Sequence, residues 1–322
     1  MLAVFSPSRV SAFSLTLSRP QAKQWPVRIC VIFNPAAKGD KARRFRRHLD
    51  EIAAQSALKL TTGPGEARPL AAQAVAEGFD IVVAAGGDGT VNEVLNGLGD
   101  VPDGFERARL GLLPLGTVNV FARELDLPRN VVKAWHTLLK GNEARIDLPR
   151  VEYGQNGAVR RRYFAQMAGA GLDARAVELV NWEIKKRTGP LAYVWAGIQA
   201  LAGVQAKIIA KISSAQAEGE LVLIGNGRLY GGDYRIFPNA DLRDGLLDLC
   251  VFPRINWLTL ARCGPSLLLR GCLPRSAAMV HQAAEFTLEA PATTPFEVDG
   301  ELVGHLPAKF SVERSRLRVI VP

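Results

Sequence analysis

A glycine-rich loop carrying one carboxylate is the segment of this sequence best suited to chemistry. Residues 86–90, GGDGT, follow the apolar run IVVAA and precede the helical pattern TVNEVLNGL. Glycines let the backbone approach a ligand closely, and the first turn of a helix offers free N–H groups to a phosphate. A bare carboxylate would repel phosphate, so Asp88 indicates contact with magnesium or with a hydroxyl. The alternative is a tight turn in which Asp88 caps the helix.

Two further loops have the same character. Residues 34–39, NPAAKG, and residues 116–119, GTVN, each follow an apolar run. The carboxyl ends of parallel strands open on one edge of a sheet, where ligands bind. We therefore expect the three loops to converge on one phosphate-bearing ligand. The sequence contains neither the Walker pattern nor a strand-linked GxGxxG, which argues against an ordinary P-loop or Rossmann site.

The elements that must position these loops alternate along the first half of the chain. Apolar runs at 27–34, 58–62, 79–85 and 110–116 predict strands, and the patterns at 41–57, 66–78 and 90–98 predict helices. This alternation predicts an α/β domain, a parallel sheet with helices on both faces. From residue 148 onward, many short strands with turn signals predict a second, mainly antiparallel β-sandwich domain. These include a hairpin signal at Asn156-Gly157 and strands at 235–240, 308–313 and 317–322. We expect a disordered tail at 1–26, the α/β domain at 27–147 and the β-sandwich domain at 148–322.

Composition and charge exclude several classes of protein. The 322 residues are 48% hydrophobic and 22% charged, typical of a soluble chain with a real core. No apolar run reaches the roughly 20 residues that span a bilayer. The net charge of +9 lies in residues 1–47, which hold ten Lys or Arg against Asp40. A nucleic-acid binder more often spreads basic and aromatic residues along one face. We therefore expect no nucleic-acid partner, and an N-terminal charge suited to phosphates or an anionic membrane.

The motifs NPAAKG, GGDGTVNEV and LPLGTVNVFAR, in this order, resemble the catalytic domain of the diacylglycerol kinase family. That family includes sphingosine and ceramide kinases and soluble bacterial lipid kinases. The later segments YFAQMAGAGLDA, GNGRLYGGDYRIFPNADLRDGLLDL and FEVDGELV are similar to family segments too. The resemblance runs from about Val27 to the C-terminus. It implies an ATP- and Mg²⁺-dependent kinase of a lipid hydroxyl, on diacylglycerol or a related lipid. The α/β domain at 27–147 would bind the nucleotide, and the β-sandwich at 148–322 would be the lipid-substrate domain.

The resemblance also implies roles for particular residues. Glu301 matches the proton acceptor of the family's Asp-Gly-Glu segment, with Asp299 beside it and Asp88 completing an acidic cluster around magnesium. Asp299-Gly300 is also a signal for a type I′ hairpin turn, which is compatible with that role. Asp241, Asp244 and Leu246 match a second, structural magnesium site, although NADLRDG reads equally well as a surface turn. The nucleotide would lie against Asn34, Pro35, Gly39, Thr61, Gly86, Gly87, Asp88, Gly89, Thr90, Val91, Asn92, Gly116 and Thr117.

Three positions depart from the family pattern. Val120 stands where Asp is common, which removes one carboxylate near the nucleotide. Gln166 replaces the usual Asn, and Asp233 follows Gly231-Gly232 where a third Gly is common. None of these departures removes an implied catalytic group, but Val120 bears on nucleotide or metal preference.

The lipid must come from a membrane, and two segments fit a peripheral contact. Residues 179–201 carry Trp182, Trp195 and the bases 185–187, and residues 41–47 form a basic cluster. The competing interpretation of residues 179–201 is a packed core helix. A cytoplasmic enzyme at the inner face of the membrane follows from this view, and a homodimer is left open. The alternative functions are an NAD kinase, or a non-catalytic lipid or nucleotide sensor on the same fold.

Overall fold

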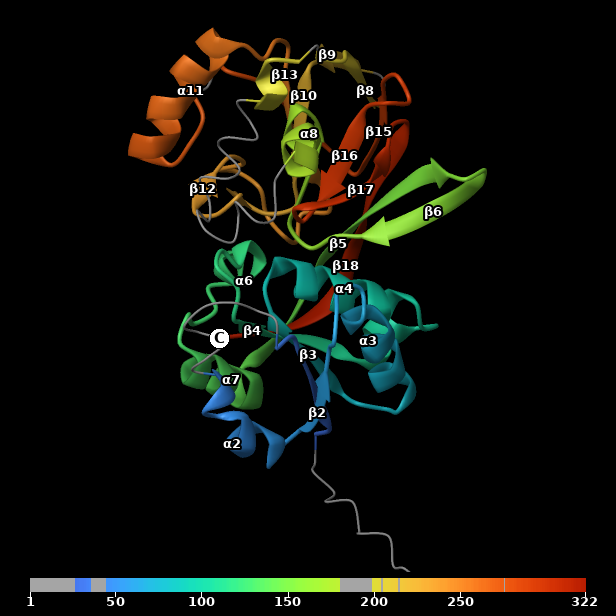
Figure 1. Cartoon of the computed structure of the whole chain (residues 1–322), viewed down its shortest axis with the longest axis vertical. Helices are drawn as coiled ribbons and strands as arrows, with labels where there is room; N and C mark the ends of the chain where they lie inside the picture. The colour runs from blue at the N-terminus through green and yellow to red at the C-terminus, as the bar shows by residue number, and fades with distance from the viewer. Residues whose placement is uncertain (1–26, 36–44, 180–198, 204, 214, 275) are drawn as a thin grey trace, which may run out of the picture.

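The structure, a computed structural model, describes residues 27–35, 45–179, 199–203, 205–213, 215–274 and 276–322. The expected tail at 1–26, Gly39 and most of the expected membrane segment at 179–201 lie outside these residues. The chain forms two halves stacked along its long axis, with helices α3 (Ala67–Ala76), α4 (Asp88–Gly99) and α7 (Val131–Lys140) in the lower half (Figure 1).

The lower half is built on four parallel strands in the order β2-β1-β3-β4. Alternate side chains point to opposite faces, so Cys30 and Val82 join one core cluster while Val31 and Val83 join another. Helices α3 and α4 cover the first face, and α2 and α7 cover the second. The predicted α/β architecture is confirmed. The bounds are β1 Ile29–Phe33, α2 Leu49–Ala53, β2 Ala57–Leu60, α3 Ala67–Ala76, β3 Ile81–Gly86, α4 Asp88–Gly99, α5 Gly104–Arg107, β4 Arg109–Pro114, α6 Val120–Glu124 and α7 Val131–Lys140.

The upper half is a β-sandwich. An antiparallel sheet, β14-β13-β10-β7-β16-β17, faces the strands β15, β18 and β8 of the longer sheet across one core. Phe164, Phe296 and Phe310 are fully buried there, and Phe310 contacts the other two rings edge to face. This confirms the predicted antiparallel sandwich. The bounds are β5 Asn142–Gln155, β6 Ala158–Tyr163, β7 Met167–Gly171, β8 Ile208–Ile212, β9 Ala215–Gly219, β10 Leu221–Gly225, β11 Leu229–Tyr230, β12 Tyr234–Arg235, β13 Leu247–Phe252, β14 Met279–Ala283, β15 Glu285–Glu289, β16 Pro295–Val298, β17 Glu301–His305 and β18 Ala308–Val321.

Two long antiparallel strands, β5 and β18, tie the halves together. The first part of β18 pairs with β15 in the sandwich, and Val319 near its end pairs with Leu110 of β4. The sequence predicted two strands at 308–313 and 317–322, but the structure has one strand with a register shift between Glu313 and Leu317. The predicted division at 147/148 falls inside β5, so the two halves share one sheet; the division itself stays a prediction.

Helices α8 (Leu172–Leu179) and α11 (Trp257–Arg270) lie on the sandwich half. Residues 236–240 were predicted as part of a strand but form turns, because Pro238 cannot donate to a sheet and Phe237 packs against Gly225. The Asn156-Gly157 turn, with positive φ at both residues, forms the predicted hairpin between β5 and β6. No helix that the structure describes is long and apolar enough to cross a bilayer.

Candidate active site

The loops that the sequence singled out lie at one edge of the parallel sheet. Because β1 to β4 are parallel, the loops that follow them share the carboxyl edge. The N–H of Gly116 donates to the carbonyl of Gly86 at 3.2 Å, and a Cβ on Gly116 would lie 2.6 Å from the Cα of Gly87. The GGDGT and GTVN loops therefore touch backbone to backbone, which only glycine allows at that distance.

The loops that follow β1 and β2 approach the same edge. The N–H of Asn34 donates to the carbonyl of Ala85, and the N–H of Thr61 donates to Phe33. The Thr61 hydroxyl is buried and has no hydrogen-bond partner among the described residues. A buried hydroxyl without a partner costs about 1–3 kcal/mol, so it fits a place where a bound ligand supplies the partner. The Pro35 carbonyl accepts a hydrogen bond from Arg46, and Thr117 is exposed in the GTVN loop after β4.

Residues 86–92 form the turn into α4 and its first turns. Gly87 is the N-terminal cap of α4 and has an extended backbone. Thr90 packs so closely on Gly86 that a Cβ on Gly86 would overlap the Thr90 side chain. Val91 lines a small cavity at the junction of the two halves. Asn92 is fully buried and points toward the sandwich half, where it contacts Asp299 rather than the sheet edge.

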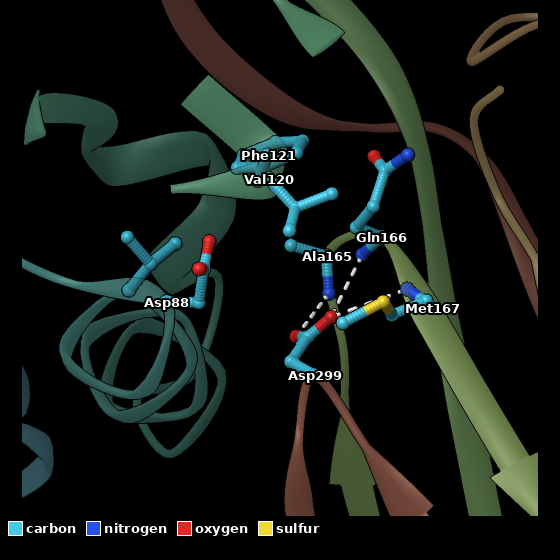
Figure 2. A pocket seen from close by; sticks show the side chains of 8 residues that line it. Asp88, Val120, Phe121, Ala165, Gln166, Met167 and Asp299 are labelled. Carbon is cyan, nitrogen blue, oxygen red and sulfur yellow. Dashed lines mark hydrogen bonds between the residues drawn. The ribbon is translucent and has the colours of Figure 1, made fainter. Parts of the chain in front are cut away.

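Asp88 and Asp299 face one cavity from different halves of the chain (Figure 2). The cavity has a volume of about 10 Å³, room for about one water or ion, and Val120 and Phe121 close another side. Burial and the Asp299 carboxylate raise the pKa of Asp88 to about 6, although backbone amides at 119–121 oppose the shift. Two carboxylates held close together fit a divalent cation, because it would relieve their repulsion. Val120 lines the same cavity as the two carboxylates, so the cavity has an apolar wall at the position where the family commonly has Asp.

Asp299 is anchored rather than free. Its carboxylate accepts hydrogen bonds from the backbone amides of Ala165, Gln166 and Met167 at 2.8, 3.0 and 3.2 Å, drawn as dashed lines in Figure 2. A fourth bond comes from the Asn92 amide at 2.8 Å. Burial nevertheless raises its pKa above the ordinary value. Asp299 and Gly300 both have positive φ and join β16 to β17 in the two-residue turn that the sequence predicted.

Glu301 begins β17 and reaches across to the glycine-rich loop. Its Oε1 lies 2.8 Å from where a Cβ on Gly89 would be, so the absence of a side chain there makes room for the carboxylate. Its Oε2 accepts a 2.7 Å hydrogen bond from Arg162. Burial raises the pKa of Glu301, and Arg162 partly opposes that shift. The structure therefore brings Asp88, Asp299 and Glu301 to one junction.

Arg162 is a residue of this site that sequence reasoning missed. From β6 it donates to Glu301 and also, through Nε and Nη2, to the Asn92 side-chain oxygen at 3.0 and 2.7 Å. Because that oxygen is taken, the Asn92 amide nitrogen must face Asp299. The three consecutive arginines at 160–162 gave no signal that one of them turns inward.

A second missed contact joins the halves through Glu124. This buried carboxylate of α6 accepts hydrogen bonds from Arg228, the N–H of Leu229 and the side chain of Gln166. The same Gln166 whose backbone holds Asp299 therefore also fixes α6, the helix that follows the GTVN loop. Asp233, the third departure, pairs with Arg123 at 2.7 Å on the surface nearby.

Asp241, Asp244 and Leu246, which we expected to bind a structural magnesium, lie in a hydrogen-bonded turn. Asp241 accepts from the N–H of Arg243, and Asp244 accepts from the N–H of Leu246. Buried Asp147 fastens the same turn by accepting from the N–H of Gly245. Among the described residues no three His, Cys, Asp or Glu side chains gather as metal ligands. The second metal site stays a prediction.

The sequence matches the diacylglycerol kinase catalytic domain over residues 28–151 and the YegS C-terminal NAD kinase beta sandwich-like domain over residues 166–321. Residues 28–151 therefore form a diacylglycerol kinase catalytic domain, and a sandwich domain of the YegS C-terminal type follows it. Diacylglycerol kinases of Staphylococcus carnosus (strain TM300) and Bacillus subtilis (strain 168) are each 29% identical, over 91% of this chain and 94% and 95% of theirs. The protein is therefore a lipid kinase that phosphorylates an alcohol, as the resemblance implied.

Solved structures agree on the fold. The crystal structure of a diacylglycerol kinase from Bacillus anthracis str. Sterne matches with a TM-score of 0.70 at 24% identity, over 92% of this chain and 97% of that one. Yeast NADH kinase complexed with NADH matches more distantly, with a TM-score of 0.50 at 9% identity, over 95% of this chain and 88% of that one. Both likenesses concern the architecture of two joined halves.

Proposed function

We propose that this protein transfers the γ-phosphoryl group of ATP, with Mg²⁺, to the hydroxyl of diacylglycerol or a closely related lipid at a membrane surface. One observation carries the proposal: the Glu301 carboxylate of the sandwich half lies against Gly89 of the nucleotide loop of the other half. An acceptor hydroxyl held by the sandwich would thus meet the phosphate end of a nucleotide bound by the loops. The curated relatives named diacylglycerol kinase support this choice of acceptor.

Phosphoryl transfer needs positioning, charge neutralisation and a group that orients the acceptor hydroxyl more than covalent catalysis. Glu301 is the proposed base, because its Oε1 accepts no hydrogen bond from any described residue while Oε2 is held by Arg162. It takes the hydroxyl proton as the lipid oxygen bonds to the γ-phosphorus and the bond to ADP breaks. Asp299 cannot fill this role as readily, since four donors already surround its oxygens.

Asp88 is the proposed contact for the metal. Magnesium, when bound, would neutralise the negative charge that develops on the leaving ADP, with Asp88 as its contact on the protein. The residues fit: Asp88 supplies hard oxygen atoms beside a cavity of about 10 Å³, and the anchored Asp299 carboxylate adds negative charge to it. The Thr61 hydroxyl and the glycine-rich backbone supply the nucleotide's hydrogen bonds. We place Asn34, Pro35 and Thr117 at the rim of the same nucleotide site.

The experiment is a phosphorylation assay with labelled ATP and dioctanoylglycerol, a short-chain lipid that does not require a vesicle. Glu301→Gln should lower kcat by about 10²–10⁴, the usual contribution of a general base, with nucleotide affinity unchanged. Lys211→Gln, which alters an exposed cation paired with Glu289 on the sandwich, serves as the matched control. An unchanged kcat in Glu301→Gln would remove Glu301 from the mechanism.

A further inference from the structure

Helix α11 shows an apolar face on the side turned away from the protein. Its inner side packs through Cys263, which is buried, and Leu267 on the sandwich core. At 100° per residue, positions 257, 258, 261, 265, 268 and 269 fall on the opposite side, and all six are Trp, Leu, Ala or Pro. The exposed fractions are 60% for Trp257, 69% for Leu258, 79% for Leu268 and 84% for Leu269.

A helix that is apolar on both sides is normally buried, so this one needs an occupant for its outer face. The helix itself is well formed: the Asn256 side chain caps its start by accepting from the N–H of Thr259, and Gly271 ends it in left-handed conformation. Arg262 holds it to the following segment through Ser276. Figure 1 shows α11 at the outer edge of the sandwich half, far from the α/β half.

The charged residues that the sequence places on this helix and next to it are of one sign. Between Asp248 and Glu285 the sequence contains no acidic residue, while Arg254, Arg262 and Arg270 border the helix. All three arginines are exposed. A partner with an apolar interior and a negatively charged surface complements such a face on both counts, and an anionic bilayer has this construction.

The length of the helix fits a position in the plane of a membrane. Fourteen residues extend about 21 Å, too short to cross a hydrocarbon core of about 30 Å. The distance along the axis from Trp257 to Leu268 is about 16 Å. The pairs 257/258 and 268/269 therefore form two apolar contact points along one side of the helix. Trp is also the side chain that is enriched at the boundary between headgroups and acyl chains.

We propose that the outer face of α11, formed by Trp257, Leu258, Leu268 and Leu269, inserts into the surface of an anionic lipid bilayer while Arg254, Arg262 and Arg270 contact its headgroups. The inference rests on the proposed lipid-kinase function, because such an enzyme must take its acceptor from a bilayer. It assigns the membrane contact to an element separate from residues 179–201 and 41–47. The inner face of α11 packs in the cluster that Tyr230 joins, and the Tyr230 hydroxyl lies 3.1 Å from Glu297, next to the turn that bears Glu301.

Vesicle flotation of the full chain tests the inference. Wild-type protein should float with vesicles of phosphatidylcholine and phosphatidylglycerol in equal parts, and less with phosphatidylcholine alone. Leu268→Asp/Leu269→Asp should lower the partition coefficient at least tenfold. Arg254→Gln/Arg270→Gln should lower it on anionic vesicles alone, by about fivefold for each charge. Val132→Asp/Leu139→Asp, which places the same two charges on exposed positions of α7, should float like wild type.

The kinase assay on dioctanoylglycerol separates this inference from the proposed function. The α11 variants should phosphorylate the short-chain lipid at the wild-type rate and lose activity on lipid presented in vesicles. Equal flotation of wild type and Leu268→Asp/Leu269→Asp would overturn the membrane assignment. A second result would also overturn it: wild type that binds no vesicles but sediments as a dimer, with the dimer lost in Leu268→Asp/Leu269→Asp. That result would assign the face to a second copy of the chain. An absence of wild-type flotation with a lower unfolding midpoint in the variant would show that the chain covers this face itself. Vesicle binding through α11 without activity on any lipid would instead refute the function alone.

Discussion

Replacing Asp299 by Asn should destabilise the protein strongly although the two side chains have the same shape. In the wild type, Oδ1 accepts from the amides of Gln166 and Met167, and Oδ2 accepts from the amide of Ala165 and from Asn92. An asparagine turns one of these oxygens into an NH₂ group. Whichever way the amide is placed, that group faces two N–H donors instead of serving as their acceptor.

The magnitude follows from the number of donors left without a partner. Each buried unsatisfied donor costs about 1–3 kcal/mol, so two of them predict a loss of about 2–6 kcal/mol in the free energy of unfolding. Asn92 cannot relieve the clash by turning over, because its oxygen already accepts from Arg162 and from Asn96. The substitution also loosens the turn that carries Glu301, so activity should fall with stability.

Urea unfolding followed by fluorescence measures this loss, with Glu301→Gln as the matched control on the same turn. Glu301 is partly exposed and has one side-chain partner among the described residues, so its substitution should change stability by less than about 1 kcal/mol. A change below 1 kcal/mol for Asp299→Asn would refute the reasoning that its carboxylate is the anchor of the turn.

Three further substitutions probe the electrostatics of the junction. Arg162→Met should raise the pKa of Glu301 further, so the acidic limb of the rate profile should move to higher pH, whereas Arg162→Lys should restore part of the wild-type profile; identical profiles would contradict the contact. Asp88→Asn should abolish activity yet stabilise the protein without nucleotide by at most about 3 kcal/mol. The raised pKa of Asp88 makes the wild type lose stability as pH rises from 3.8 through about 6. The extra stability of Asp88→Asn over wild type should therefore be complete above that pH range and absent below it. Val120→Asp should lower the melting temperature in EDTA because it adds a third carboxylate to the cavity, and millimolar Mg²⁺ should restore it; a magnesium response equal to that of wild type would count against a metal there.

The sequence was sufficient where local patterns carry the information. Apolar runs followed by glycine loops predicted the parallel sheet and the edge where Gly87 and Gly116 meet. The pair Asp299-Gly300 predicted its turn, because two adjacent positive φ angles favour those residue types.

Contacts made over long sequence separations were not predictable in this way. Arg162 and Glu301 are 139 residues apart, and Asn92 and Asp299 are 207 apart. These pairs depend on how the turn between β16 and β17 packs against α4 and β6, which no local pattern encodes. The outward apolar face of α11 was missed for a related reason: its composition matches a buried helix, and only the position of Cys263 in the core shows which side is exposed.

The central claim is that this fold phosphorylates a lipid hydroxyl. The most direct test incubates the full chain with γ-labelled ATP, Mg²⁺ and a lipid extract containing diacylglycerols, ceramides and sphingoid bases, and then separates the labelled products. We expect label in phosphatidic acid with wild-type protein and a loss of about 10²-fold or more with Glu301→Gln. Folded protein that binds ATP but labels no lipid, or that labels NAD instead, would contradict the account.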